Sequence, residues 1–117
     1  MIHIDQHTQV FLATGATDMR KSINGLSILV ETVLLQNPLS SHVFVFCNRG
    51  RDKLKILVWH NNGFWLFYRR LEKQRFHWPA PSETISMNIS SRELSWLLEG
   101  LDIRHVSAHK RLDYSII

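Results

Sequence analysis

Apolar residues recur at helical spacing in an early part of the chain. Steps of three and four residues place on one helical face the side chains of Met19, Ile23, Leu26, Val30 and Val33. The side chain of Thr17 or Asp18 can cap the first turn of this helix, because either accepts a bond from an orphan amide. Asn37-Pro38 then ends the helix. Gly25 interrupts the stripe, which predicts either a close approach of another group or a helix that begins only near this glycine.

A second helical stripe lies near the end of the sequence. Ser90 and Glu93 have the spacing of a capping box, in which each side chain bonds the backbone amide of the other residue. The stripe that follows consists of Leu94, Leu97, Leu98 and Leu101. Gly100 is well placed to close this helix as its C-terminal cap.

Runs rich in β-branched and aromatic residues predict strands over residues 9–13, 42–47, 53–60, 64–70 and 84–89. The run 42–47 is apolar, as a buried strand would be, whereas the run 84–89 alternates and predicts a half-buried strand. Four of the strands follow one another without a helix between them. This order favours an α+β fold, in which an antiparallel or mixed sheet with a central hairpin packs against two helices.

The predicted hairpin has a turn signal and an unusual charge pair. Asn62-Gly63 is typical of a two-residue type I′ turn, in which both residues need positive φ. Such a turn would place Lys55 directly opposite Arg70, and like charges in that position are destabilising. A bound anion, a nearby carboxylate or screening by solvent would relieve the repulsion. Both faces are apolar near the turn, so we expect this end of the hairpin to be covered on both sides.

Composition indicates an ordinary globular protein. The chain has 117 residues, of which 44% are hydrophobic and 21% charged, so one core can form without disulfides. We expect a single domain with a core over residues 9–104 and a less ordered tail over residues 105–117. Cys47 is the sole cysteine, and the sequence shows neither a secretory signal nor an apolar run of membrane-helix length. These features together predict a cytoplasmic protein.

Positive charge is concentrated in residues 49–75, which hold eight basic and two acidic side chains. The rest of the chain holds six basic and eight acidic side chains, so this segment accounts for the net charge of +4. A clustered field of this kind attracts polyanions, and a surface that only aids solubility is the alternative. The segment also carries aromatic rings, which either pack in the core or stack on bases. Trp65 and Trp78 are the two to check for exposure.

No pattern in the sequence indicates a catalytic centre, a cofactor or a metal site. Glycine-rich phosphate loops and nucleophile elbows are absent. His105 and His109 could share one helical face, but no third metal ligand accompanies them. Cys47 ends an apolar run, which predicts a buried structural thiol. Because the carboxylates are scattered, the protein is not expected to be an enzyme.

Three motifs in order resemble a family of small proteins from bacterial insertion sequences. The first is TDMRKSINGL over residues 17–26, and the third is LLEGLD over residues 97–102. The second runs from Val43 to Pro79 through VFVF, KIL, the Asn62-Gly63 pair, LFYRRLE and RFHWP. The resemblance covers residues 9–104. The family comprises the TnpB-type, or second-reading-frame, accessory proteins of the insertion-sequence sixty-six group, which are unrelated to the RNA-guided nuclease that shares the TnpB label.

The resemblance implies a protein that is encoded beside a separate DDE-type transposase and is needed for efficient transposition. It assigns no catalytic residues. This sequence departs from the family pattern at three places: Cys47-Asn48 replaces a basic stretch, His60 replaces a common acidic residue, and Ile103 replaces a common tryptophan.

We weigh three hypotheses for the function. The first is an accessory protein that binds transposon DNA and assists the transposase, with phosphate contacts from Arg49, Arg51, Lys53, Lys55, Arg69, Arg70 and Arg75, and with Arg20 and Lys21 as a second patch. The second is a protein-binding module that docks on the transposase without touching DNA. The third is a cryptic enzyme, such as a nuclease subunit, whose activity would depend on Asp18 or Glu72.

Overall fold

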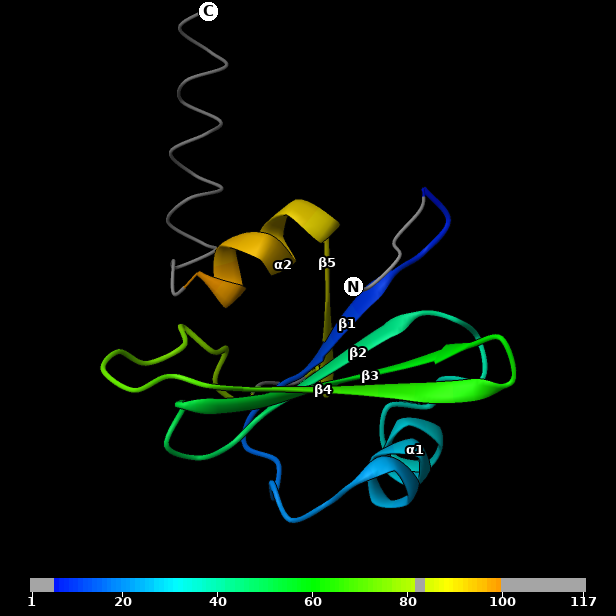
Figure 1. Ribbon diagram of the computed structural model, residues 1–117, viewed down its shortest axis with the longest axis horizontal. Coiled ribbons are helices and arrows are strands. Elements are labelled where there is room, and N and C mark those ends of the chain that lie inside the picture. Colours follow the sequence, from blue (N-terminus) through cyan, green and yellow to red (C-terminus); the bar gives the residue numbers. More distant parts are fainter. Residues whose placement is uncertain (1–5, 82–83, 100–117) are drawn as a thin grey trace, which may run out of the picture.

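The computed structural model describes residues 6–81 and 84–99 of the chain (Figure 1). Along the described residues, the elements are β1 (Val10–Ala13), α1 (Ile23–Thr32), β2 (Val43–Cys47), β3 (Lys53–His60), β4 (Gly63–Arg70), β5 (Ser86–Ile89) and α2 (Ser91–Leu98). The predicted Gly100 cap, Leu101, Ile103, the two late histidines and the tail over residues 105–117 lie outside the described residues.

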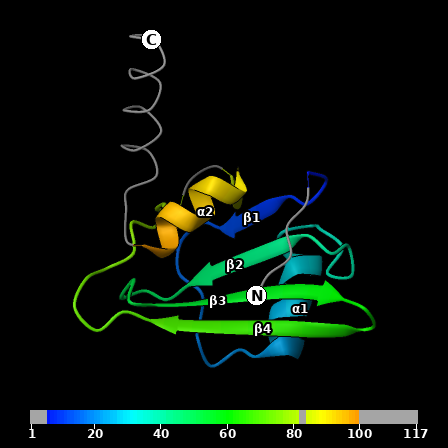
Figure 2. The same cartoon turned by 45° about the horizontal axis from the view of Figure 1, so that its top comes forward.

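The strands form one sheet in the order β4-β3-β2-β1-β5. β1 and β2 pair in parallel, and the other neighbours pair antiparallel, so the sheet is mixed. The two helices lie on opposite sides of this sheet (Figure 1). Figure 2 shows β1 to β4 side by side with α1 behind them. The predicted α+β fold with a mixed sheet and two packed helices is therefore confirmed.

The core has two layers because the central strands are buried on both faces. On the α1 side, Phe44, Phe46 and Leu57 pack with Leu26 and Val30. On the other side, a second cluster joins β2 and β3 to α2 through Val45, Ile56, Leu94, Leu97 and Trp78. Burial of apolar area on both faces is the main stabilising contribution to such a sheet. The prediction of a buried strand around residues 42–47 is confirmed, since every residue of β2 is buried.

The two tryptophans singled out by the sequence have different environments. Trp78 is buried, and its indole Nε1 donates to the carbonyl oxygens of Ala13 and Gly15 at 3.0 and 2.9 Å. It therefore holds the end of β1 and has a structural role. Trp65 on β4 is 57% exposed. The expectation that both faces near the hairpin turn are covered is wrong for Trp65, because no element of the described residues lies over this ring closely enough to bury it.

The first helix begins later than its apolar stripe predicts. α1 starts at Ile23 with Ser22 as its N-cap, and the Ser22 side chain makes no cap bond. The predicted caps are wrong because Asp18 is used in a local turn, where its Oδ1 accepts from the Arg20 amide at 2.9 Å. Residues before Ile23 therefore reach the helix as a loop.

The far end of α1 also differs from the predicted stripe. Val33 is the C-cap residue and is exposed, whereas Leu34 takes the buried position expected of it. Gly25 lies inside α1, and a Cβ atom at this position would come within 3.3 Å of the Lys21 side chain. The close approach proposed for this glycine is thus real, and it lets Lys21 lie over the first turn.

The second helix agrees with its sequence signals. Ser90 is the N-cap, and the Ser90 hydroxyl accepts from the Glu93 amide at 3.1 Å while Glu93 Oε1 accepts from the Ser90 amide at 3.0 Å. This confirms the capping box. Leu94 and Leu97 are buried against the sheet, and Leu98 is half-buried.

The hairpin turn falls one residue earlier than predicted. Asn61 and Asn62 have φ of 47° and 66°, so they form the type I′ turn, and Gly63 opens β4 opposite His60. Asparagine tolerates positive φ better than most residues, which makes either dipeptide a competent turn. The observed register is two residues away from the predicted one, so every side chain keeps its predicted face. Hydrophobic alternation cannot distinguish the two registers for this reason.

This register overturns the predicted pairing of Lys55 with Arg70. Lys55 lies opposite Tyr68, and Arg70 lies opposite Lys53. A pair of like charges is therefore retained, but it is moved to the last position of the hairpin. There, solvent and local counter-charges reduce the repulsion.

Candidate nucleic-acid interface

The loop before α1 carries an exposed ion pair. The Arg20 guanidinium donates to Asp18 Oδ2 through Nη2 at 2.7 Å and to both carboxylate oxygens through Nε at 3.1 Å. These hydrogen bonds lower the pKa of the Asp18 carboxyl from 3.8 to about 2, and the positive charge of Arg20 adds to them. The Arg20 side chain is 91% exposed, so its guanidinium projects into solvent in spite of the pair.

Lys55 fixes this loop to the sheet. Its ammonium donates to the carbonyl oxygen of Met19 at 2.9 Å and to that of Lys21 at 2.8 Å. The two carbonyls are 36 and 34 residues away from Lys55 in sequence. If α1 began earlier in the chain, these two carbonyls would accept hydrogen bonds from backbone amides of the next helical turn. Because they accept from Lys55 instead, the lysine holds this segment in a non-helical conformation. The loop and β3 consequently lie side by side.

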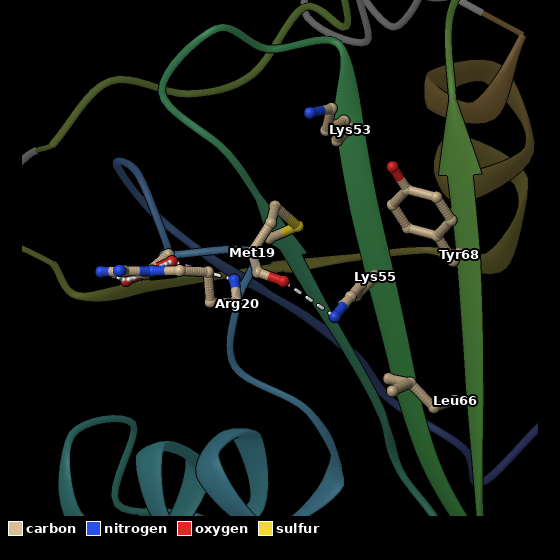
Figure 3. A pocket seen from close by; sticks show the side chains of 7 residues that line it. Met19, Arg20, Lys53, Lys55, Leu66 and Tyr68 are labelled. Atoms are coloured by element: carbon tan, nitrogen blue, oxygen red, sulfur yellow. Dashed lines mark hydrogen bonds and ion pairs between the residues drawn. The ribbon is translucent and has the colours of Figure 1, made fainter.

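An open groove of about 650 Å³ forms between the loop and the hairpin, and we call it the cationic groove. Its lining residues are Asp18, Met19, Arg20, Lys53, Lys55, Leu66 and Tyr68. Figure 3 shows Met19 and Arg20 on the loop, the two lysines on β3, and Leu66 and Tyr68 on β4. The groove residues of β3 and β4 lie on the sheet face that packs on α1, at the end of the hairpin that the helix does not cover.

Arg70 extends the positive charge at the end of this face. It lies opposite Lys53, and paired residues on neighbouring strands point to the same side of a sheet. The Arg70 guanidinium donates to Glu72 Oε1 at 2.8 and 3.0 Å. This carboxylate reduces the repulsion between Arg70 and Lys53, a pair that replaces the predicted one of Arg70 with Lys55.

The turn before β3 presents further cations at the same end of the sheet. The Asn48 amide oxygen accepts from the backbone of Asp52 and Lys53, and its amide nitrogen donates to the Asp52 carboxylate at 2.8 Å. The Asn48 hydrogen bond is the main cause of a lowered pKa at Asp52, to which the charge of Arg75 contributes slightly. This rigid turn leaves Arg49 and Arg51 exposed.

The structure brings most of the predicted phosphate-binding residues to one region. Arg20, Lys53 and Lys55 line the cationic groove, and Arg70 lies on the same face. At the same end of the sheet or beside the groove are Arg49, Arg51, Arg75 and Lys21. Arg69 is separate, because it pairs with Leu54 and so points to the side where α2 packs.

Sequence reasoning missed the uncharged part of this region. Trp65 and Trp78 were the rings singled out for exposure, but Tyr68 is 54% exposed, and it lines the groove together with Met19 and Leu66. A usable signal did exist. Tyr68 and Arg70 alternate along β4 as Lys53 and Lys55 do along β3, so the two pairs share one face in either register.

The described residues offer little to redox or metal chemistry. Cys47 is buried, and burial raises the pKa of its thiol to about 12, so it is a structural residue as predicted. Over residues 6–81 and 84–99, no three histidine, cysteine, aspartate or glutamate side chains lie close enough to hold a metal ion. In the same ranges, the helices are too short or too polar to cross a membrane.

Comparison with known proteins places the chain beside mobile-element proteins. Residues 8–108 match the sequence family described as IS66 Orf2 like protein. The uncharacterized protein y4hO of Sinorhizobium fredii is 41% identical over 105 residues, which cover 90% of each chain. The uncharacterized protein y4jC of the same organism is 33% identical over 102 residues, covering 87% of this chain and 86% of that protein. No solved structure matches the chain significantly.

Proposed function

The chain belongs to the IS66 Orf2-like family, and from this premise we propose that it is a transposition accessory protein that binds nucleic acid through the cationic groove. It acts beside a separate transposase and catalyses no reaction itself. Transposon DNA is the natural polyanion for such a protein. The phosphate contacts come from Lys53, Lys55, Arg70 and Arg20, with Arg49, Arg51, Arg75 and Lys21 around them.

One observation carries this proposal: cations from distant stretches of the chain line the same open groove. Arg20 comes from the loop before α1, whereas Lys53 and Lys55 come from β3. Arg70 adds a fourth charge from β4 on the same face. A phosphate backbone that crosses this end of the sheet would meet several cations at once and release its counterions.

The acidic partners of two of these cations do not cancel the positive field. The Arg20–Asp18 and Arg70–Glu72 pairs are both exposed, and such pairs contribute little, so a phosphate can replace either carboxylate. Lys55 gives two of its three N–H groups to backbone carbonyls, which carry no net charge and so do not neutralise it. Among the described residues, Lys53 has no acidic partner at ion-pair distance.

Fluorescence anisotropy with a labelled duplex that carries an element end tests the proposal. The variant Lys53→Gln/Arg70→Gln removes two charges from the groove face. We expect its affinity to fall by about tenfold at near-physiological salt, and the slope of log affinity against log salt to become shallower by about two.

A matched control removes two charges from the other side of the sheet. Arg69 points to the α2 side, and Arg92 is an exposed residue of α2 itself. Arg69→Gln/Arg92→Gln should leave the affinity nearly unchanged, because charges remote from the bound phosphates are screened. Equal losses in both variants would contradict the groove as the binding face. Binding by the unmodified protein that does not depend on salt would contradict the proposal as a whole.

Docking on the transposase is a second candidate function, and exposed apolar residues favour it. Ile28 on α1 is 60% exposed, and Leu35 and Leu39 in the following segment are 75% and 51% exposed. Large exposed apolar side chains mark protein contact sites when they form one patch, and these three come from one short stretch of the chain. This surface belongs to the helix and the segment after it, so it would leave the cationic groove open to DNA.

Retention of the element's transposase on the immobilised protein, after nuclease treatment, tests this second function. Ile28→Ser/Leu35→Ser should reduce the retained amount. Ile85→Ser, which changes an exposed apolar residue beside β5, should not. Loss of retention on nuclease treatment alone would show that nucleic acid, and not a protein contact, links the two molecules.

A further inference from the structure

Tyr68 is an exposed ring that lines the cationic groove. It lies directly opposite Lys55 on the neighbouring strand, and Lys53 is two positions further along that strand. Figure 3 shows the ring on the β4 side, at a level between the two lysines of β3, with its hydroxyl directed toward the Lys53 end. Within the described part of the chain, no residue accepts from or donates to this hydroxyl. Neither core packing nor a hydrogen bond therefore accounts for the position of the ring.

The lining of the groove is more apolar than a phosphate backbone requires. Met19 and Leu66 border it together with the ring of Tyr68. Cations alone suffice to hold the backbone of a duplex, whose base faces are hidden in the stack. A flat apolar and aromatic surface next to cations is instead the arrangement with which proteins hold unpaired bases.

Lys55 makes this arrangement rigid. Its bonds to the carbonyls of Met19 and Lys21 fix both the ammonium and the loop that forms the other wall of the groove. One N–H of Lys55 remains for a phosphate, and Arg70 lies two residues from Tyr68 on the same face. A nucleotide whose base stacks on the ring would thus have cations within reach of its flanking phosphates.

From this juxtaposition we infer that the cationic groove binds an unpaired nucleotide of single-stranded DNA, with the base stacked on Tyr68 and its phosphates on Lys53 and Lys55. The inference rests on the proposed nucleic-acid binding and refines it, because it names the form of nucleic acid that the groove prefers.

Anisotropy with a short labelled oligodeoxythymidylate, compared with a duplex of matched length, tests the inference. Tyr68→Ala should lower the affinity for the single strand by roughly tenfold, the effect of losing one stacked base, and leave duplex affinity within about twofold. Tyr68→Leu keeps apolar bulk without a π face and should behave like Tyr68→Ala. Tyr68→Phe keeps the ring and should behave like the unmodified protein.

Trp65 provides the matched control on the same strand. It is 57% exposed, close to the 54% of Tyr68, but it points to the opposite face of the sheet. Trp65→Ala should leave both affinities unchanged. The inference is overturned if Tyr68→Ala weakens both probes equally, if Tyr68→Leu binds like the unmodified protein, or if Trp65→Ala alone loses the single strand. Failure of the unmodified protein to bind either probe would instead remove the proposed function from which the inference starts.

Discussion

The α1-facing side of the β3–β4 hairpin has two halves that differ in burial and in the charge of their side chains. Near the turn, Leu57 is fully buried, and Phe64 packs against the cluster that contains α1. Leu66 lies at the boundary, because it packs against the same cluster and also lines the groove. At the far end, the same two strands present Lys53, Lys55, Tyr68 and Arg70 on the same face. The first half is part of the core, and the second half is the wall of an open groove.

The difference shows how the helix boundary creates the site. α1 begins only at Ile23, so the residues before it approach the sheet as a loop. Lys55 fixes that loop through two backbone carbonyls. One strand therefore supplies core residues where the helix covers it and ligand-binding residues where the loop leaves it open. The side chains change from apolar to basic at the position where the cover ends.

The largest effect should come from truncating the covered half. Leu57→Ala leaves a cavity under α1 and should lower the free energy of unfolding by about 2–5 kcal/mol. Lys53→Ala, four residues earlier on the same face, should change it by about 1 kcal/mol or less. Chemical denaturation followed by circular dichroism measures both. A Lys53 variant as destabilised as the Leu57 variant would show that the two halves do not differ as described.

A smaller loss of stability should come from replacing Lys55, which fixes the loop before α1 to β3. Lys55→Met keeps the length of the side chain but removes both bonds to the loop carbonyls. We expect a loss of about 1.5–3 kcal/mol, the usual range for hydrogen bonds to a charged group. In this variant, the amides of residues 16–22 should exchange faster with solvent than they do in the unmodified protein, whereas the amides of β2 should not. Unchanged exchange in that loop would contradict the anchoring role of Lys55.

The smallest effect should follow from removing the acidic group at the groove. Asp18→Asn frees the Arg20 guanidinium, so DNA affinity should rise by roughly two- to fivefold, the scale of one exposed ion pair. A lower affinity in this variant would mean that Asp18 positions Arg20 for binding.

The titration of Asp18 gives an independent check. Its folded-state pKa of about 2 lies below the ordinary 3.8, so the stabilising contribution of the pair is present above pH 3.8 and is lost as the pH falls through about 2. An NMR titration of the carboxyl should show this low midpoint. In Arg20→Gln, the midpoint should return toward 3.8, because the guanidinium is the main cause of the shift.

The sequence predicted the helices and strands better than their register and packing. The apolar run of β2 and the Ser90–Glu93 capping box depend on local patterns, and both are observed as predicted. The hairpin register was missed because Asn61-Asn62 and Asn62-Gly63 are both competent type I′ turns that give the same faces.

For the candidate site, the sequence indicated which residues are basic but not how they are arranged in space. The basic segment included Lys53 and Arg70, which lie on the groove face, but it also included Arg69, which points to the other side of the sheet. The role of Lys55 depends on carbonyls more than 30 residues away, and a carbonyl carries no sequence signal. The exposure of Tyr68 likewise depends on where the helix begins, which the apolar stripe places too early.

Mapping the bound nucleic acid onto the protein tests the central claim most directly. Titration of the isotope-labelled protein with a short oligodeoxythymidylate, followed by amide chemical shifts, should give the largest changes in residues 18–21, 53–55 and 68–71. The amides of α2 and of the turn around Asn61 should change little. Shifts centred on α2, or spread evenly over both faces of the sheet, would contradict a binding site in the groove between the loop and the hairpin.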